Sequence, residues 1–271
     1  MPNVEVVVAA MNQSDFSLVE KLNIRCDVLI ANQTDNNSYC EAEMPYGKAR
    51  IVSTTTRGVG VNRNIGLAFS KNDILMLADD DLVYNDDMPE KVEGAFNELK
   101  EADVIIFGTF FSKNGEIYKK RFCKTKKLPI LKSMRYGTYS VAIRRSSLKC
   151  ANINFNELFG GGCIYSHGED SDFIINCYKR GLKVYTYNYV LGVTSKDSST
   201  WFTGYNEKYF YDTGALAKNT FGIFAMPYMV RFALRKDAEE GITFKKKMDL
   251  MLAGYRNYKK LISYDEWKKG R

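Results

Sequence analysis

The stretch Asp73-Ile74-Leu75-Met76-Leu77-Ala78-Asp79-Asp80-Asp81 joins five consecutive apolar residues to three adjacent carboxylates. A short continuous apolar run is typical of a strand that is covered on both faces, as in a parallel sheet. In open α/β sheets, ligands bind beyond the carboxyl ends of such strands. Three adjacent carboxylates repel one another unless a cation or hydrogen-bond donors neutralise them, so Asp79 and Asp81 are candidate ligands for Mg²⁺ or Mn²⁺. The alternative is a solvated turn that caps the following segment.

Apolar runs and helical patterns alternate along the rest of the first 195 residues. This alternation predicts an α/β fold with a mainly parallel sheet flanked by helices. We expect strands at 4–10, 26–31, 49–53, 73–78, 103–111, 138–143 and 183–190, and helices at 14–23, 61–70, 88–102 and 171–180.

The character of the chain changes beyond about residue 195. Residues 201–221 are aromatic and polar, residues 221–234 are apolar, and residues 243–271 are strongly basic. We therefore expect a catalytic domain at 1–195 and a C-terminal helical appendage at 196–271. The appendage either packs on the core with a solvated basic face or makes a peripheral contact with the inner face of an anionic membrane.

Composition narrows the classes of function. The formal charge is +7, which favours an anionic partner, and the six cysteines form no C-x-x-C pair, which favours buried thiols in a reducing compartment. The N-terminus has no signal-peptide pattern and no run of about 18 apolar residues occurs, so we expect a cytoplasmic protein. His167 is the single histidine, which excludes a multi-histidine metal site and favours oxygen ligands.

A second acidic cluster follows the glycines Gly160-Gly161-Gly162. It reads His167-Gly168-Glu169-Asp170-Ser171-Asp172-Phe173 at the start of an expected helix. Negative charge is favourable in the first turn of a helix, so this cluster has a purely structural explanation. A carboxylate in such a cluster also suits a general base that accepts a proton from a hydroxyl group.

Several of these motifs together resemble the family-2 glycosyltransferases of the GT-A fold. In that family an A-R-N-x-G helix precedes a strand that ends in D-x-D, and here Asn62-Arg63-Asn64-Ile65-Gly66 precedes the strand that ends at the three aspartates. The second acidic cluster resembles the family segment G-x-G…G-E-D-x-x-F. Residues 4–12 resemble the opening strand of the family. Residues 32–35 stand where the family carries D-G-S-T-D, with Gln33 in place of the aspartate that contacts the base of the nucleotide.

The resemblance implies a Rossmann-like GT-A domain and an inverting, metal-dependent hexosyltransferase of polysaccharide biosynthesis. Asp170 would be the catalytic base, Asp79 and Asp81 would hold Mn²⁺ or Mg²⁺, and the donor would be a nucleotide-diphosphate sugar, with UDP the expected nucleotide. The acceptor would be a hydroxyl group of a glycan, lipid-linked or glycoprotein substrate. The residues implied in donor binding are Ala9, Met11, Asn12, Asn32, Gln33, Arg57, Arg63, Asn64, Asp79, Asp80, Gly161, Gly162 and Glu169.

The chain departs from the family pattern after its last expected strand. Relatives often carry a histidine near the metal there, whereas this chain reads Val193-Thr194-Ser195-Lys196. Water or a hydroxyl group would have to replace that ligand.

Two other classes of function remain open at this point. A nucleotidyltransferase acting on sugar phosphates uses a similar sheet and acidic site, but residues 9–15 lack its glycine-rich loop with a lysine. A non-catalytic carbohydrate-binding or nucleic-acid-binding protein would fit the many aromatic residues and the positive charge. The sequence contains no recognisable nucleic-acid-binding motif, so we expect no nucleic-acid partner.

Overall fold

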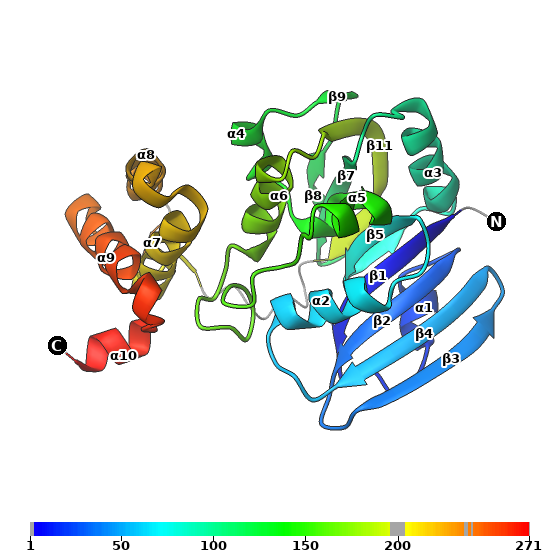
Figure 1. The fold of residues 1–271 in the computed structure, drawn as a ribbon, viewed down its shortest axis with the longest axis horizontal. Helices are drawn as coiled ribbons and strands as arrows, with labels where there is room; N and C mark the ends of the chain where they lie inside the picture. The colour runs from blue at the N-terminus through cyan, green and yellow to red at the C-terminus, as the bar shows by residue number, and fades with distance from the viewer. Residues whose placement is uncertain (1–2, 196–203, 236–237, 240, 271) are drawn as a thin grey trace. The chain divides into compact units, whose positions relative to one another are not determined.

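The computed structural model describes residues 3–195, 204–235, 238–239 and 241–270 (Figure 1). These residues form two compact units. Unit 1 contains the described residues of Met1–Arg57, Val61–Phe155 and Phe173–Ser199, and unit 2 contains those of Gly58–Gly60, Asn156–Asp172 and Thr200–Arg271.

Unit 1 is built on a mixed sheet in which the described strands follow the order β3-β4-β2-β1-β5-β10-β7-β11-β6. The first five of these strands, from β3 to β5, can be followed in Figure 1. Strands β4, β2, β1 and β5 run parallel to one another, and β7 runs parallel to β11. Strands β3, β6, β8, β9 and β10 pair antiparallel with their neighbours. In addition, β8 pairs with β7 and β9 pairs with β11. The bounds are β1 Val4–Met11, β2 Asp27–Gln33, β3 Ser38–Met44, β4 Gly47–Thr54, β5 Ile74–Asp79, β6 Leu82–Tyr84, β7 Val104–Lys113, β8 Glu116–Arg121, β9 Lys126–Lys127, β10 Val141–Arg144 and β11 Val184–Ser195.

Helices cover both faces of this sheet because successive side chains of a buried strand point to opposite faces. On β1, Val6 packs in a core with residues of α1 and α3, whereas Val7 packs in a second core with residues of α2, α5 and α6. The arrangement is a three-layer α/β/α domain, as expected for an apolar parallel sheet. The bounds are α1 Ser17–Lys21, α2 Val59–Phe69, α3 Met88–Glu98, α4 Ile130–Ser133, η1 Thr138–Ser140, α5 Arg145–Cys150 and α6 Glu169–Lys179.

Unit 2 consists mainly of helices around its own aromatic core. Phe159 and Tyr165, which precede α6 in the chain, belong to this core. Helices α7 and α9 cross at two glycines, because a Cβ at Gly214 would lie 1.9 Å from the Met251 carbonyl oxygen and a Cβ at Gly254 would lie 1.9 Å from that of Tyr211. The bounds are α7 Glu207–Phe221, η2 Gly222–Phe224, α8 Met226–Ala233, α9 Phe244–Asn257, η3 Tyr258–Lys260 and α10 Tyr264–Lys269.

The structure confirms the expected fold class and the C-terminal helices, with differences of detail. The expected strand at 138–143 begins as the 3₁₀ turn η1, and only 141–144 pair as β10. The expected helix at 14–23 is limited to α1, with Asp15 accepting a hydrogen bond from the Ser17 amide just before it. The division into units also differs from the expected one at 195, because segments 58–60 and 156–172 group with the C-terminal helices. Part of the expected aromatic stretch, 201–203, lies outside the described residues.

Two expectations from composition are also clarified. All six cysteines are free thiols, but only Cys26, Cys123 and Cys177 are buried, whereas Cys40 and Cys150 are exposed. The expectation of buried thiols is therefore wrong for the last two. Among the described residues, no helix has the length and the apolar character needed to cross a bilayer.

Candidate functional site

The carboxyl ends of four parallel strands bring together most of the residues expected to bind the donor. In the register of the sheet, Ala9 of β1 lies between Ala31 of β2 and Asp79 of β5, and Met11 lies opposite Gln33. Because these strands are parallel, their last residues share one edge of unit 1. The structure therefore places Ala9, Met11, Asn32, Gln33 and Asp79 at a single edge of the sheet.

Asn12 and Asn32 shape the loops at this edge. Asn32 is fully buried, its side-chain amide donates to the Gln13 carbonyl (2.9 Å) and to Ser53 Oγ (2.9 Å), and its Oδ1 accepts from the Gln13 amide (2.9 Å). Asn12 adopts a left-handed backbone (φ 53°), which asparagine tolerates better than most residues. The Asn32 side chain thus holds the turn after β1 and makes its contacts within the protein.

Helix α2 is fastened to the same edge by the motif Asn62-Arg63-Asn64-Ile65-Gly66. The Asn62 amide donates to the carbonyl oxygens of Ala10 (3.2 Å) and Ala31 (2.8 Å), so it joins the ends of β1 and β2. A Cβ at Gly66 would lie 2.6 Å from Val7 Cγ1, so only glycine allows the helix to approach the sheet this closely.

Arg63 and Asn64 of the motif have different partners. Buried Arg63 donates to Asp79 Oδ1 (2.7 Å), and its guanidinium lies 5.2 Å from the centre of the Phe155 ring. The Asn64 side chain bonds the backbone of Phe155 in both directions (2.7 and 3.0 Å). Arg63 therefore holds a positive charge at the first aspartate of the triplet, while Asn64 fixes the segment that leads to the second acidic cluster.

The three aspartates occupy different environments. Asp80 is exposed, and its carbonyl oxygen accepts from Lys21 Nζ (3.2 Å). Asp81 is half-buried, and its carbonyl accepts from the Ser195 amide (3.2 Å). Burial, and then the negative charge of Asp79, raises the pKa of Asp81 from an ordinary value of 3.8 to about 6. The nearby Thr194 side chain opposes this rise, because it favours the charged form of the carboxylate and so lowers its pKa. The groups of the protein around Asp81 therefore neutralise the negative charge of the triplet only in part.

Residues Thr194 and Lys21 were not predicted from the sequence. Thr194 stands in the segment where the family resemblance implies a histidine, and its side chain lies near enough to Asp81 to lower the pKa of that carboxyl group. Backbone proximity makes this approach possible: a Cβ at Gly192 would lie 1.9 Å from the Val83 carbonyl oxygen, so glycine is required for β11 to pair with β6. The neighbouring Lys196 of that segment lies outside the described residues.

The donor set at this edge fits a small divalent cation. Two carboxylates, Asp79 and Asp81, lie close enough for the charge of one to raise the pKa of the other, and a hydroxyl group adjoins them. Mg²⁺ and Mn²⁺ are commonly bound by one or two carboxylates, with water and phosphate oxygens completing the shell. No cluster of three or more potential ligands from histidine, cysteine, aspartate and glutamate occurs in the part of the chain that the structure describes.

Arg57 serves the loops beside this edge. Its guanidinium bonds Asp35 Oδ1 (2.6 Å) and donates to the carbonyl oxygens of Thr34, Thr55 and Thr56 (2.9–3.1 Å). About half of the Arg57 side chain is exposed. It therefore organises two loops, and the contact with a phosphate expected for it stays a prediction.

The glycine-rich loop of unit 2 is tightly folded. The Val59 amide donates to the Gly161 carbonyl (3.0 Å), and Gly160 (φ 104°) and Gly162 (φ 76°) have backbones that favour glycine. A Cβ at Gly160 would lie 2.4 Å from Val59 Cγ1 and 2.8 Å from Glu169 Cδ. The loop thus packs directly on the first residue of α6.

The start of α6 is anchored by its third acidic residue. Buried Asp172 accepts from the Asn219 amide (2.7 Å) and the Thr220 hydroxyl (3.1 Å) through its Oδ1. Asp170, the expected base, is half-buried in the same first turn. Asp170 belongs to unit 2 and the aspartate triplet to unit 1, so the role of catalytic base that the resemblance implies for Asp170 stays a prediction.

His167 contacts protein groups within unit 2. Its ring stacks on Tyr209 (4.1 Å, 7°), and Nε2 lies 3.1 Å from Thr213 Oγ1. Since the Thr213 hydroxyl donates to the Tyr209 carbonyl (2.8 Å), it accepts from His167 Nε2–H. The buried Nδ1 has no hydrogen-bond partner among the described residues, and burial lowers the pKa of His167 to about 4.

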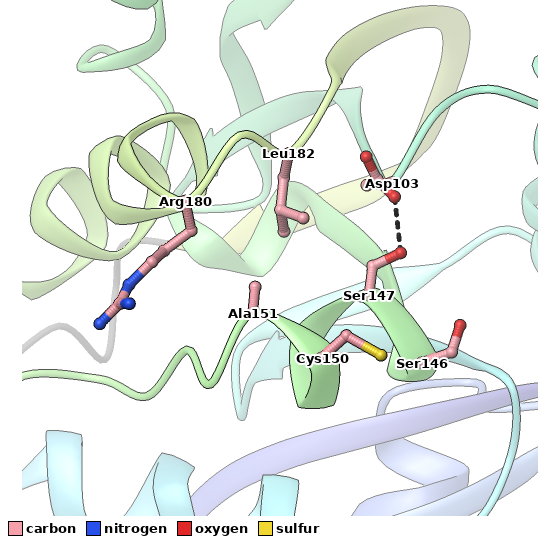
Figure 2. Close-up of a pocket in the computed structure, with 7 residues that line it drawn as sticks. All are labelled: Asp103, Ser146, Ser147, Cys150, Ala151, Arg180 and Leu182. Atoms are coloured by element: carbon pink, nitrogen blue, oxygen red, sulfur yellow. Dashed lines mark hydrogen bonds between the residues drawn. The ribbon is translucent and has the colours of Figure 1, made fainter.

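A pocket of about 360 Å³ lies at the other edge of the unit 1 sheet (Figure 2). Its lining includes Asp103, which precedes β7, and Leu182, which precedes β11. Because β7 and β11 are parallel, these residues lie at the same edge of the sheet. Figure 2 shows Ser147 donating to Asp103 (2.6 Å) and the guanidinium of Arg180 turned away from that pair. This pocket contains none of the residues expected to bind the donor.

Comparison with known proteins agrees with this geometry. Residues 28–152 match the family model for glycosyl transferase family 2. The crystal structure of S. aureus TarS 1–349 is similar with a TM-score of 0.58 at 14% identity, over 99% of this chain and 92% of that chain. The complex of the same protein with UDP-GlcNAc gives a TM-score of 0.60 at 14% identity over the same shares. The longer S. aureus TarS gives 0.54 at 16% identity, and the match covers 97% of this chain and 44% of that one.

No curated protein sequence matches the chain. The structural likeness shows the fold, and the family model covers β2 to the end of α5, which includes the aspartate triplet and the helix that positions it. Residues 28–152 therefore match glycosyl transferase family 2, and the chain has the GT-A fold of these structural neighbours.

Proposed function

We propose that the chain transfers a sugar from a nucleotide-diphosphate sugar, with UDP as the nucleotide, to a hydroxyl group of a glycan acceptor with inversion at the anomeric carbon. The observation that carries the proposal is the shared edge of unit 1, where Ala9, Gln33 and Asp79 lie in neighbouring strands and Arg63 is paired with Asp79. The structural neighbour TarS was crystallised with UDP-GlcNAc, which supports the choice of a UDP-sugar.

Each part of the edge has a task in this proposal. The ends of β1 and β2, with Met11, Asn12 and Gln33, receive the nucleoside. Arg57 and Arg63 carry positive charge toward the diphosphate, since arginine suits phosphate contact. Asp79 and Asp81 would hold Mn²⁺ or Mg²⁺, which supplies charge neutralisation for the leaving diphosphate when it is bound.

The second acidic cluster supplies the base in this proposal. The Asp170 carboxylate accepts the acceptor's hydroxyl proton as that oxygen forms a bond to the anomeric carbon. The bond between the anomeric carbon and the diphosphate oxygen breaks on the opposite face, and the nucleoside diphosphate leaves with the electron pair. One base and one leaving group on opposite faces give inversion. Gly161, Gly162 and Glu169 shape the loop beside the base.

The test is transfer with a panel of UDP-sugars and Mn²⁺, followed by Asp170→Asn. Loss of a general base lowers turnover by about a hundredfold or more, while binding of the donor is kept. Asp249→Asn, which removes an exposed acid of unit 2, is the matched control and should keep full turnover. Wild-type turnover in Asp170→Asn would contradict the role of Asp170. Release of diphosphate from a nucleoside triphosphate and a sugar phosphate would instead indicate a nucleotidyltransferase.

We further propose that unit 2 makes a peripheral contact with an anionic membrane. Along α8 and its two capping residues, Ala225, Met229 and Ala233 are buried, whereas Met226, Val230 and Leu234 form an exposed stripe at the same spacing of four. The preceding turn adds Ile223 (81% exposed) and Phe224 (77% exposed). Exposed Arg231 lies on the same helix, so the surface combines apolar side chains with positive charge, as interfacial helices do. A lipid-linked acceptor would be reached in this way.

A further inference from the structure

Positive charge is dense in one segment of unit 1. Residues 113–127, which we call the basic hairpin, contain seven basic residues and one acidic residue, a net charge of +6. Residues 243–271 carry the same net charge over nearly twice the length. They comprise β8, β9 and the turns beside them. Its seven basic residues are Lys113, Lys119, Lys120, Arg121, Lys124, Lys126 and Lys127, and all but half-buried Arg121 are exposed.

Aromatic rings accompany these charges. Lys119 Nζ lies 5.2 Å from the centre of the Phe111 ring, and Lys120 Nζ lies 5.6 Å from that of Phe110. Phe122, whose side chain is 63% exposed, packs edge-to-face on Phe110 (5.1 Å). Cation–π contacts restrict where a lysine places its ammonium group, so Lys120 stands at a defined position beside Phe110 and the exposed Phe122 ring. Lys119 lies over the buried Phe111 ring on the other face of the strand. A mixed surface of this kind suits a ligand with both apolar and anionic groups.

The sheet register connects the basic hairpin to the donor edge. Lys120 of β8 pairs with Phe110 of β7. On the next strand, β11, Val193 lies opposite Phe110, and Val193 also lies opposite Val83 of β6. Strand β6 begins directly after Asp81. Neighbouring strands lie about 4.8 Å apart, so three steps across the row span about 14 Å. A chain of two or three sugars has this length.

We propose that the basic hairpin binds an anionic glycan, with phosphate or carboxylate groups along its chain, as the acceptor of sugar transfer. That this glycan is the acceptor rests on the proposed function. That the surface binds an anionic glycan rests on its charge, its aromatic rings and the register of the sheet. The lysines contact the anionic groups of the polymer, and Phe122 with Phe110 contacts the carbon-bound hydrogens of its sugars. The polymer lies across β7 and β11 toward Asp81.

Dextran sulfate and neutral dextran of the same length are suitable probes, since they differ only in charge. We expect the wild-type protein to bind dextran sulfate and not neutral dextran in a calorimetric titration. The double variant Lys119→Gln/Lys120→Gln should weaken binding at least about tenfold, which equals about 1.4 kcal/mol. The control Lys259→Gln/Lys260→Gln removes two adjacent exposed lysines of unit 2 and should weaken it less than about twofold, if position and not total charge decides.

A second variant tests the rings. Phe122→Ala removes an exposed side chain without opening the core, and it should weaken binding of dextran sulfate by about threefold or more while the net charge stays the same. Circular dichroism checks that each variant is folded. The proposal would be overturned if the two double lysine variants lost equal affinity for dextran sulfate, or if the wild type bound neutral dextran tightly.

The same variants separate the glycan from other anionic partners. Tighter binding of single-stranded RNA or of anionic vesicles than of dextran sulfate, with the same dependence on Lys119 and Lys120, would overturn it. Both double lysine variants should bind UDP-sugar as tightly as the wild type does. If the wild type transfers no sugar but its binding of dextran sulfate depends on Lys119 and Lys120, the proposed function fails and the glycan surface stands.

Discussion

At the scale of single residues, Asp172 is the best-defined support of the second acidic cluster. Its carboxylate accepts from Asn219 and Thr220 of α7 while buried. Hydrogen bonds to a charged group contribute about 1.5–3 kcal/mol each, so Asp172→Ala should lower the free energy of unfolding by about 2–3 kcal/mol or more. Urea denaturation measures this. A double-mutant cycle with Asn219→Ala should show a coupling above about 0.5 kcal/mol, and strict additivity would contradict a direct contact.

His167 gives a prediction about pH because it is the single histidine. Burial lowers its pKa to about 4, with Asp212 opposing and Lys208 adding to that shift, whereas the unfolded chain titrates near 6.5. Protonation in the folded state would place a proton on the buried Nδ1, which has no acceptor among the described residues. Between pH 6.5 and 4 the unfolded state therefore binds more protons, and stability falls as the pH falls.

Urea denaturation at pH 7, 6 and 5 measures this dependence. One proton changes the free energy of unfolding by up to about 1.4 kcal/mol per pH unit. His167→Gln keeps a donor for Thr213 and cannot titrate, so its stability should fall less over this range. Equal slopes for the two proteins would show that His167 does not titrate there.

At the scale of elements, the crossing of α7 and α9 depends on glycine. A Cβ at Gly214 would lie 1.9 Å from a backbone oxygen, and a backbone cannot move aside as a flexible side chain can. Overpacking costs about 1–3 kcal/mol or more, so Gly214→Ala should lower the melting temperature of the protein. In the control Gly94→Ala, a Cβ would meet nothing within 4 Å on α3, and stability should rise by about 0.5–1 kcal/mol. A neutral Gly214→Ala would contradict the close crossing.

The exposed stripe of η2 and α8 can be tested with vesicles. Ile223→Ser/Phe224→Ser should weaken cosedimentation with vesicles that contain phosphatidylglycerol by at least about tenfold, since each large apolar side chain contributes about 1.5–3 kcal/mol when fully buried. Tyr39→Ser/Tyr46→Ser removes two exposed aromatic residues of unit 1 and is the matched control. If the two pairs behave alike, the stripe does not contact the membrane.

The sequence predicted the buried elements well because burial leaves a pattern. Strands β1, β2 and β5 are apolar runs, and each was expected within three residues of its bounds. Strand β3 is mostly exposed, and β6 has only three residues, so neither carries an apolar run. Strand β3 is stabilised by pairing with β4, which follows it directly in the chain, whereas β6 pairs with β11, which is distant in the chain.

The site was predictable by position but not by contact. The motif around Arg63 and the aspartate triplet located the edge, and the structure brings both together through the Arg63–Asp79 ion pair. The use of Asn32 within a turn and the proximity of Thr194 to Asp81 depend on loop geometry and strand register, which sequence spacing does not determine. The sequence led to no prediction for the lysines at 113–127, because their place three strands away from β6 depends on the register of the sheet.

At the scale of the whole molecule, binding of the donor product should stabilise the protein in a metal-dependent way. A ligand at 100 times its Kd adds about 2.7 kcal/mol to the free energy of unfolding, which raises the melting temperature by about 5 °C or more. We expect this rise with UDP and Mn²⁺ together and not with UDP after chelation. Asp81→Asn should remove it. An unchanged rise in that variant would move the cation site away from Asp81.

The concentration of charge in residues 113–127 has a consequence for handling the protein. Residues 243–271 also carry a net charge of +6, but over nearly twice the length, and the remaining residues together carry −5. A cation-exchange resin therefore meets positive charge at its highest density along the chain at residues 113–127. Replacing two lysines there by glutamine should shift the elution to lower salt more than replacing two lysines in a less densely charged segment.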